Sequence, residues 1–154
     1  MISPDYTEGS EVAVKDMAGH LIRRLQQYST QIFSTRMQAA GFDLTPVQFA
    51  ALDAIRLNPG IDQAGVAAII AYDRATIGGV IDRLEQKGYI ARSISRRDRR
   101  AREVRLTEAG EVAFQAVAPV VLALQDDILN GLDDAEKAAF LAALRKIVLG
   151  PATR

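Results

Sequence analysis

The segment 73–106, DRATIGGVIDRLEQKGYIARSISRRDRRAREVRL, contains the signals of one helix and two strands. Apolar residues recur at helical spacing, with Asp73 as the expected N-cap and Gly88 just after the last helical residue. Alternating residues at 89–94 and 102–106 then predict two short strands joined by a polar tip. The segment is therefore expected to fold as a helix followed by a β-hairpin.

Arginine is concentrated in this hairpin. Seven arginines lie between Arg92 and Arg105, offset only by Asp98 and Glu103, although the whole chain has 19 basic and 19 acidic residues. A segregated cluster of this kind can neutralise phosphates and displace their counterions, so it indicates binding to a polyanion. Charge alone leaves open a solvated loop or a protein-binding patch.

A short helix is predicted just before this segment. Asp62 is its expected N-cap, the helix runs to about Ile70, and Tyr72 and Asp73 separate it from the next helix. Two helices joined by so tight a turn indicate a helix-turn-helix. With the basic hairpin that follows, the order is that of a winged helix, in which one helix enters a major groove of DNA and the wing reaches the neighbouring minor groove.

The candidate DNA contacts of the predicted recognition helix share positions away from its buried stripe, or near its N-terminal edge. They are Arg74, Ala75, Thr76, Gly79 and Arg83. Gly78 and Gly79 each cost about 1 kcal/mol relative to alanine inside a helix, so close approach of a partner to the backbone is one reason for them. For Gly78, tight packing against the preceding helix is an alternative.

Two helices are predicted on the N-terminal side. Residues 11 to about 40, ending at Gly41, form an amphipathic helix longer than a small core can cover. Thr45 and the following proline begin the next helix, which ends at the breaker 58–60. The excess length of the first helix suggests that part of it packs on another subunit.

Two further helices are predicted on the C-terminal side. Thr107 caps one that runs to about Leu129 and contains Pro119, while Asp133 and Glu136 form a capping box for the last. The expected fold is mainly α with a small β-wing. It comprises an N-terminal arm at 1–10, a dimerisation layer at 11–41 and 107–150, and a winged helix-turn-helix DNA-binding domain at 42–106.

Composition argues against several other classes of function. The chain has no cysteine and a single histidine, His20, which leaves little from which to build a metal site or a nucleophile with its base. We therefore expect no enzymatic activity and no cofactor. The N-terminal residues lack a secretory pattern and no segment reaches 18 uninterrupted apolar residues, so we expect a cytoplasmic protein with no membrane partner.

The chain resembles the multiple-antibiotic-resistance regulator (MarR) family of bacterial transcription factors from about residue 15 to residue 149. The most specific matches are DRATIGGVIDRLEQKGYIAR at 73–92, DRR at 98–100 and VRLTEAG at 104–110. LTPVQFAALDAI and GIDQAGVAAII are similar to the family's earlier helices. The resemblance implies a homodimer that binds a palindromic operator in double-stranded DNA, represses nearby genes and releases DNA on binding a small, often aromatic, molecule.

The resemblance also implies roles for residues of the wing. Asp98 and Arg100 match the acidic and basic members of the family's D-x-R motif. Asp98 would hold the hairpin by pairing with a neighbouring arginine, unless it is simply a turn residue, and Arg100 would insert into the minor groove. The other expected DNA contacts of the wing are Arg96, Arg97 and Arg99.

On the recognition helix, Arg74 and Thr76 match positions that contact bases or phosphates, and Arg83 matches a phosphate contact. Asp82 also fits the family pattern. Because a carboxylate beside DNA is repulsive, we expect Asp82 to orient an arginine.

An effector pocket is implied between the DNA-binding lobe and the dimerisation layer. An aromatic cleft with a cation for a carboxylate could be formed by His20, Arg23, Arg24, Tyr28 and Phe49. Each candidate has an ordinary alternative. His20 could be a hydrogen-bonded helix residue, the two aromatic residues could belong to the core, and the arginines could be solvated or bridge the dimer.

The predicted function is thus a homodimeric repressor that a small effector releases from its operator, with an aromatic acid as the candidate effector. The protein is expected in a bacterial or archaeal cytoplasm, associated with the nucleoid. The alternatives are a protein-interaction module and a constitutive or architectural DNA-binding protein without a ligand.

Overall fold

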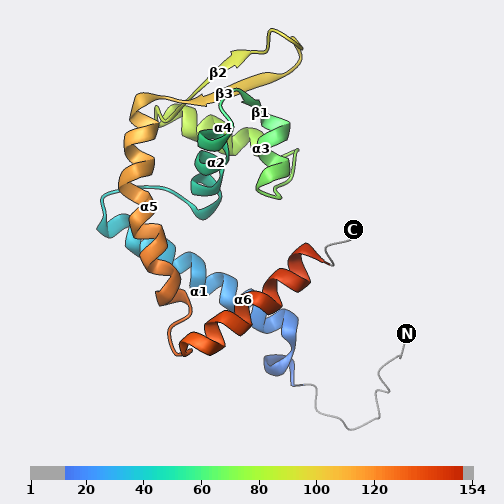
Figure 1. Cartoon of the computed structure of the whole chain (residues 1–154), viewed down its shortest axis with the longest axis vertical. Coiled ribbons are helices and arrows are strands. Elements are labelled where there is room, and N and C mark those ends of the chain that lie inside the picture. The colour runs from blue at the N-terminus through green and yellow to red at the C-terminus, as the bar shows by residue number, and fades with distance from the viewer. Residues whose placement is uncertain (1–12, 151–154) are drawn as a thin grey trace, which may run out of the picture.

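The computed structural model describes residues 13–150, so the predicted N-terminal arm at 1–10 lies outside the described part of the chain. The elements in chain order are η1 (Val14–Asp16), α1 (Ala18–Ala39), α2 (Pro46–Leu57), β1 (Ile61–Asp62), α3 (Gln63–Ile69), α4 (Ile77–Gln86), β2 (Ile90–Ile94), β3 (Arg102–Leu106), α5 (Glu108–Ile128) and α6 (Asp134–Leu149). Figure 1 shows α2, α3, α4 and the sheet gathered in one lobe. The helix α5 leads from this lobe to α6, which crosses α1.

The sheet is antiparallel with strand order β1-β3-β2. The hairpin of β2 and β3 agrees with the sequence prediction to within one residue. The strand β1 was not predicted, because two residues are too few to show alternation and the second of them, Asp62, is also the N-cap of α3. Ile61 pairs with Val104 and Asp62 with Glu103, so β1 fixes the base of the hairpin to the start of α3.

Four helices begin at the capping residues predicted from the sequence. Thr45 and Asp133 each form a complete capping box, with Gln48 and Glu136 respectively. Asp62 accepts a hydrogen bond from the backbone N–H of Gly65, and the Thr107 hydroxyl accepts one from Gly110. These bonds satisfy N–H groups that lack partners inside a helix, so they fix where each helix starts.

The start of α1 was predicted too early. The described part of that segment has a short 3₁₀ turn at 14–16, followed by Met17 with extended backbone, so α1 itself begins at Ala18. No side chain caps this start. The prediction of a single helix from residue 11 was therefore wrong over 13–17, where Val14 and Met17 are both exposed.

The start of α4 was also predicted too early. The Asp73 carboxylate accepts a hydrogen bond from the Ala75 N–H at 2.9 Å, and the Asp73 carbonyl accepts bonds from the N–H groups of Thr76 and Ile77. Asp73 therefore organises a turn, and α4 follows with Thr76 as its N-cap residue. As a result, Arg74, Ala75 and Thr76 lie on the turn before the recognition helix and not within it.

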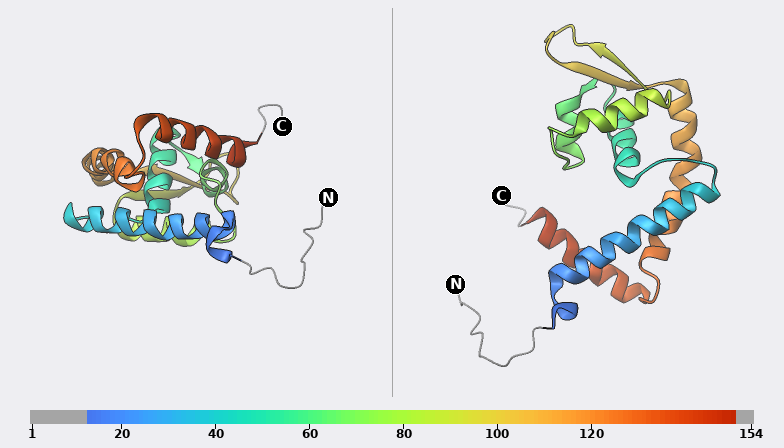
Figure 2. Two further views of the ribbon diagram at one scale, coloured as in Figure 1. Left: turned by 90° about the horizontal axis from the view of Figure 1, so that it is seen from below. Right: turned by 180° about the vertical axis from the view of Figure 1, so that it is seen from behind.

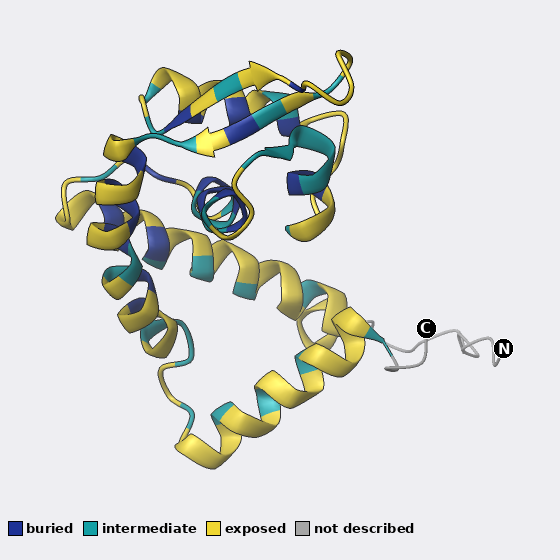
Figure 3. Cartoon of the chain, turned by 45° about the horizontal axis from the view of Figure 1, so that its top comes forward, coloured by how far each residue is buried: buried dark blue, intermediate teal, exposed yellow. Residues whose placement is uncertain are grey.

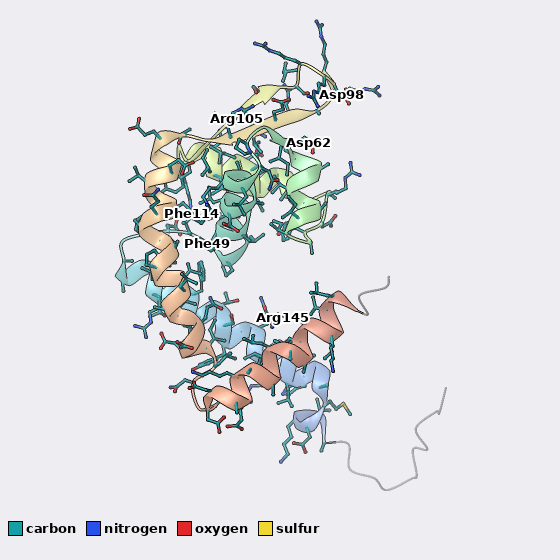
Figure 4. All side chains as sticks on the ribbon, in the orientation of Figure 1. Phe49, Asp62, Asp98, Arg105, Phe114 and Arg145 are labelled. Carbon is teal, nitrogen blue, oxygen red and sulfur yellow. The ribbon has the colours of Figure 1, made fainter. Side chains whose placement is uncertain are left out.

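The lobe and α1 share a core that is continued along α5. Phe49 of α2 stacks on Phe114 of α5 with ring centroids 5.3 Å apart, and Phe33 of α1 lies 6.5 Å from Phe49. Figure 4 shows Phe49 and Phe114 adjacent between these helices. Val117, Val121 and Leu124 of α5 are buried and extend this core along the helix.

In contrast, α6 has no buried residue. Ile147, Val148 and Leu149 are 75%, 75% and 73% exposed. Figure 3 shows exposed positions along the whole of α6 and along much of α1, and the right view of Figure 2 shows that α6 lies apart from the lobe of α2, α3, α4 and the sheet. Large apolar side chains from both ends of the described chain are therefore left uncovered within one protomer.

Candidate nucleic-acid interface

The wing tip, residues 95–101, is shaped by side-chain bonds to its own backbone. The buried Ser95 hydroxyl accepts hydrogen bonds from the N–H groups of Arg97 and Asp98 at 3.2 and 3.3 Å. Ser95 also donates its own N–H to the carbonyl of Ala101. Sequence reasoning missed Ser95, although a serine two residues before a turn is a recognised hydrogen-bonding pattern.

Asp98 acts mainly as a turn residue. Its carboxylate accepts a hydrogen bond from the Arg100 N–H at 3.0 Å, and its carbonyl accepts one from Ala101. The predicted ion pair with a neighbouring arginine is present, with Arg100 Nε 3.7 Å from Asp98 Oδ1, but the Arg100 side chain is 96% exposed. An ion pair so exposed contributes little. The Arg100 guanidinium therefore remains accessible to a partner outside the protein.

The other arginines of the wing tip extend into solvent. Arg96, Arg97 and Arg99 are exposed, and among the ion pairs of residues 13–150 none involves these three side chains. Figure 4 shows long side chains ending in nitrogen that spread outward from the tip around Asp98. Cations held on a turn of defined shape, without internal partners, are suited to contact phosphates.

Arg92 has a different role from the other arginines of the hairpin. Its Nη2 lies 2.6 Å from Asp82 Oδ1 and 3.0 Å from Glu85 Oε1, both on α4. Its Nη1 donates to Gln63 of α3 at 3.2 Å. We refer to Arg92, Asp82, Glu85 and Gln63 as the clamp. It joins the wing to both helices of the helix-turn-helix.

The clamp confirms that Asp82 orients an arginine. It also corrects the inclusion of Arg92 in the charge available to a polyanion. Arg92 pairs with Val104 across the hairpin, so it lies on the face of the sheet that covers the helices. The hydrogen bond from Arg92 lowers the pKa of the Glu85 carboxyl, and Glu85 in turn raises the pKa of Arg92.

On α4, the buried face consists of Ile77, Val80, Ile81 and Leu84. Gly79, Asp82 and Arg83 are exposed on the opposite side. A Cβ added at Gly79 would meet nothing within 4 Å, and one at Gly78 would meet only Gln63 Nε2 at 3.9 Å. Packing against α3 therefore does not require glycine at position 78, so that alternative is wrong.

The turn that precedes α4 presents the remaining predicted contacts. Arg74, Ala75 and Thr76 are all exposed. The Thr76 hydroxyl donates a hydrogen bond to the Asp73 carbonyl at 3.2 Å, which leaves its lone pairs available as acceptors. The recognition surface is thus a turn followed by the first exposed positions of a helix.

The predicted effector residues lie in three different places. On α1, Arg23 Nη2 donates to Nδ1 of the half-buried His20 at 3.2 Å, while Arg24 is exposed. Tyr28 is exposed and lines an open groove between α1 and the end of α5. Phe49 belongs to the aromatic core between Phe114 and Phe33. Within a single protomer, the structure does not bring Phe49 and the His20–Arg23 pair into contact.

Sequence reasoning missed a cation at the aromatic core. The guanidinium carbon of Arg56 lies 4.5 Å from the centre of the Phe114 ring, and Arg56 Nη2 is 2.8 Å from Asp53 Oδ1. Arg56 Nε is buried and has no hydrogen-bond partner among the described residues. The spacing of Asp53 and Arg56 on one helix face was the only signal in the sequence.

Between residues 13 and 150, no three His, Asp or Glu side chains gather where they could hold a metal ion. None of the helices in that range is long and apolar enough to cross a bilayer.

Comparison with known proteins agrees with this geometry. The family model described as MarR family matches residues 42–101. The HTH-type transcriptional repressor NicR of Pseudomonas putida is 34% identical over 135 residues, which cover 88% of this chain and 84% of NicR. The chain belongs to the MarR family. Its members are transcription regulators and not enzymes, so the winged-helix fold, the regulatory role and the absence of enzymatic activity predicted from the sequence are confirmed.

Solved structures show the same fold as this MarR-family chain. BpsR of Bordetella bronchiseptica, described in terms of regulation of its DNA binding by 6-hydroxynicotinic acid, superimposes with a TM-score of 0.81 at 31% identity. The match covers 90% of this chain and 97% of BpsR. The repressor CouR, bound to a 23-mer DNA duplex, gives a TM-score of 0.77 at 27% identity and covers 90% of this chain and 99% of CouR.

Proposed function

We propose that this MarR-family chain is a homodimeric repressor that binds a palindromic operator and releases it when a small aromatic acid binds. The observation that carries the proposal is the surface formed by the unpaired arginines of the wing tip beside the exposed face of α4 and the turn 74–76. The recognition helix would read the major groove and the wing would enter the adjacent minor groove.

The dimer is proposed from the apolar surface at the two chain ends. Exposed apolar side chains of α1 and α6, such as Leu21, Ile22 and Ile147, need a partner to remove them from water. A second copy related by a two-fold axis covers the same surface on both protomers and presents two recognition helices to two half-sites. We keep the division into a dimerisation layer at 11–41 and 107–150 and a DNA-binding domain at 42–106 as part of this proposal.

The effector is proposed to be an aromatic carboxylate. BpsR, to which this chain is similar over most of its length, is described as regulated by 6-hydroxynicotinic acid. In this chain the His20–Arg23 pair and Arg24 supply cations on α1, and Phe49 lies where α1, α2 and α5 meet. Lys87 at the end of α4 donates to the Asp43 carbonyl and to Gln48 Oε1, which gives a route from this junction to the recognition helix.

Release of DNA requires that the effector bind better to a dimer whose recognition helices are misplaced for the operator. The test uses a labelled duplex selected by the wild-type protein from a randomised library. Operator release is then followed by fluorescence anisotropy with 6-hydroxynicotinic acid, benzoates and hydroxybenzoates. We expect at least one of these acids to release the wild type, and the duplex to weaken binding of that acid by the same factor.

His20→Ala and Arg24→Ala should abolish this release without changing DNA affinity in the absence of the acid, because neither residue is on the DNA-binding surface. Gln27→Ala, at an exposed position on the same helix, is the control and should be released like the wild type. If no acid releases the wild type, the constitutive or architectural alternative is favoured. Family membership places the protein in the cytoplasm, and association with the nucleoid is part of the proposal.

A further inference from the structure

A polar cleft of about 290 Å³ lies beneath the wing, between the hairpin and the start of α3. Its polar walls include three guanidinium groups and two carboxylates, from Arg74, Arg100, Arg102, Asp62 and Asp98. Figure 4 shows Asp62 below the hairpin and Asp98 at the wing tip, which mark its two sides. Arg102 is not among the DNA contacts that sequence reasoning assigned.

Strand geometry explains why Arg102 points into this cleft. Across the hairpin, Ile94 is paired with Arg102 and the clamp residue Arg92 with the buried Val104. Side chains alternate along a strand, so Arg102 lies on the same face as Val104, toward the helices. Arg105 lies on the opposite face, where its guanidinium reaches the position that a Cβ at Gly60 would occupy.

The charges lining the cleft favour an anion. Both carboxylates already accept hydrogen bonds from backbone N–H groups, Asp62 from Gly65 at 2.7 Å and Asp98 from Arg100 at 3.0 Å. Among residues 13–150, neither Arg74 nor Arg102 takes part in an ion pair, and both are exposed. A cation would meet three guanidinium groups here, whereas a phosphate would meet two that have no internal partner.

The position of the cleft indicates which phosphate of bound DNA would lie in it. In the proposed complex α4 occupies a major groove and the wing tip occupies the neighbouring minor groove. One sugar–phosphate strand separates two adjacent grooves, so that strand must cross the protein between the recognition helix and the wing. The cleft lies at this crossing, at the foot of the wing and beside the turn that carries Arg74.

We infer that the cleft binds a backbone phosphate of the strand between the two grooves, with Arg102 and Arg74 as its ligands. This inference rests on the proposed function, because it assumes that the wing and α4 engage DNA. It assigns Arg74 to the DNA backbone, while base reading is left to Thr76 and the exposed face of α4. It also makes Arg102 a source of affinity that is independent of base sequence.

The test compares Arg102→Gln with Arg105→Gln, which removes the same charge from the opposite face of the same strand. Affinity for the selected duplex is measured over a range of salt concentrations, with the thermal midpoint of each variant as a check on folding. For Arg102→Gln we expect the slope of log K against log salt to fall by about 0.9 per protomer, and binding at low salt to weaken about ten-fold or more. Arg105→Gln should keep the wild-type slope, and Arg102→Lys should retain most of it.

Single methylphosphonate substitutions in the duplex then locate the phosphate. We expect one position in each half-site at which neutralisation weakens the wild type but has no further effect on Arg102→Gln. The inference would be overturned if Arg102→Gln kept the wild-type salt slope, or if Arg105→Gln lost as much slope as Arg102→Gln. Sequence-selective binding of the duplex by the wild type would still uphold the proposed function in either case. If no position couples to Arg102 and inorganic phosphate binds there instead, the cleft is a site for a free anion and the backbone assignment is wrong.

Discussion

At the scale of single residues, the hairpin divides its arginines between two tasks. Arg92 is held by Asp82, Glu85 and Gln63 and so belongs to the internal structure of the wing. The wing-tip arginines have no such partners beyond the weak pair between Arg100 and Asp98. The same side chain therefore serves positioning or DNA contact according to whether the carboxylates of α4 lie within its reach.

Thr76 and Arg83 should have separable effects on DNA binding. Thr76→Val keeps the shape of the side chain but removes the hydroxyl, so it should change which base pairs are tolerated, with a loss of about 1–3 kcal/mol at one position if the base contact is a good one. Arg83→Ala removes a phosphate contact and should weaken all sequences alike. Competitive binding of a randomised duplex pool, sequenced after selection, measures both effects. Equal losses on selected and random DNA for both variants would contradict base reading by Thr76.

The residue scale also shows what the sequence could and could not predict. Asp82 was correctly assigned to an arginine, because a carboxylate on a DNA-facing helix needs a cation. The choice of Arg92 as that cation depends on the register of β2 with β3, which is a long-range property. The stacking of Arg56 on Phe114 likewise depends on a contact that no local pattern reveals. Ser95 differs, because it bonds N–H groups only two and three residues ahead, a local pattern that sequence reasoning missed.

At the scale of helices and strands, the clamp fixes the angle between the wing and α4. The sequence identified both elements, since periodicity and capping residues are local signals. It placed the start of α4 too early, because Asp73 can cap a turn or a helix and only the completed backbone distinguishes the two. Arg74 and Thr76 consequently act from a turn.

Breaking the clamp should release the wing without removing a phosphate contact. Arg92→Ala should weaken operator binding while the salt slope stays near that of the wild type, because Arg92 does not face DNA. Minor-groove protection by the wing should be lost in hydroxyl-radical footprints, whereas protection of guanine N7 by the recognition helix should persist. Thermal stability should change little, since Asp82 and Glu85 are 52% and 41% exposed and ion pairs with solvated carboxylates contribute little.

Asp82→Asn is a second test of the clamp, because it removes a carboxylate that pairs with Arg92. It should give the same footprint as Arg92→Ala, with minor-groove protection lost and guanine N7 protection kept. A loss of salt slope equal to that of a wing-tip variant would contradict this role for Arg92.

The pH dependence has a definite sign. Arg92 lowers the pKa of Glu85 below its ordinary value of 4.5. The contribution of the Glu85–Arg92 pair to folding stability is therefore complete at neutral pH, and it is lost only as the pH falls through the lowered pKa.

At the scale of the whole molecule, α5 links two parts with different degrees of burial. The DNA-binding lobe shares one buried core with α1 and α5, while α6 buries nothing within one protomer. The uncovered apolar side chains of α6 fit the dimerisation layer predicted from the sequence, and the division into that layer and a DNA-binding domain stays a prediction. The effector pocket was not predictable in the same way, because a pocket between lobe and dimerisation layer depends on how two copies meet.

Val148→Asp on α6 should convert the protein to a monomer, because a carboxylate buried in an apolar interface has no partner there. Leu57→Asp on α2 is the control, since that leucine is also exposed, at 62%, but lies in the proposed DNA-binding domain at 42–106. Mass in solution at micromolar concentration distinguishes the two variants. A dimeric Val148→Asp variant, or a wild type that is monomeric yet still protects a half-site, would contradict the proposed dimer.

The central claim is that the wing-tip arginines bind the backbone and minor groove of an operator. The most direct measurement is the salt dependence of duplex binding by the quadruple variant Arg96→Ala, Arg97→Ala, Arg99→Ala, Arg100→Ala, with the quadruple lysine variant at the same positions as its control. The alanine variant should lose about 0.9 in slope for each phosphate contact removed, and the lysine variant should keep most of the wild-type slope. If the alanine variant binds the selected duplex with wild-type affinity and slope, the wing is not the DNA contact and the account is wrong.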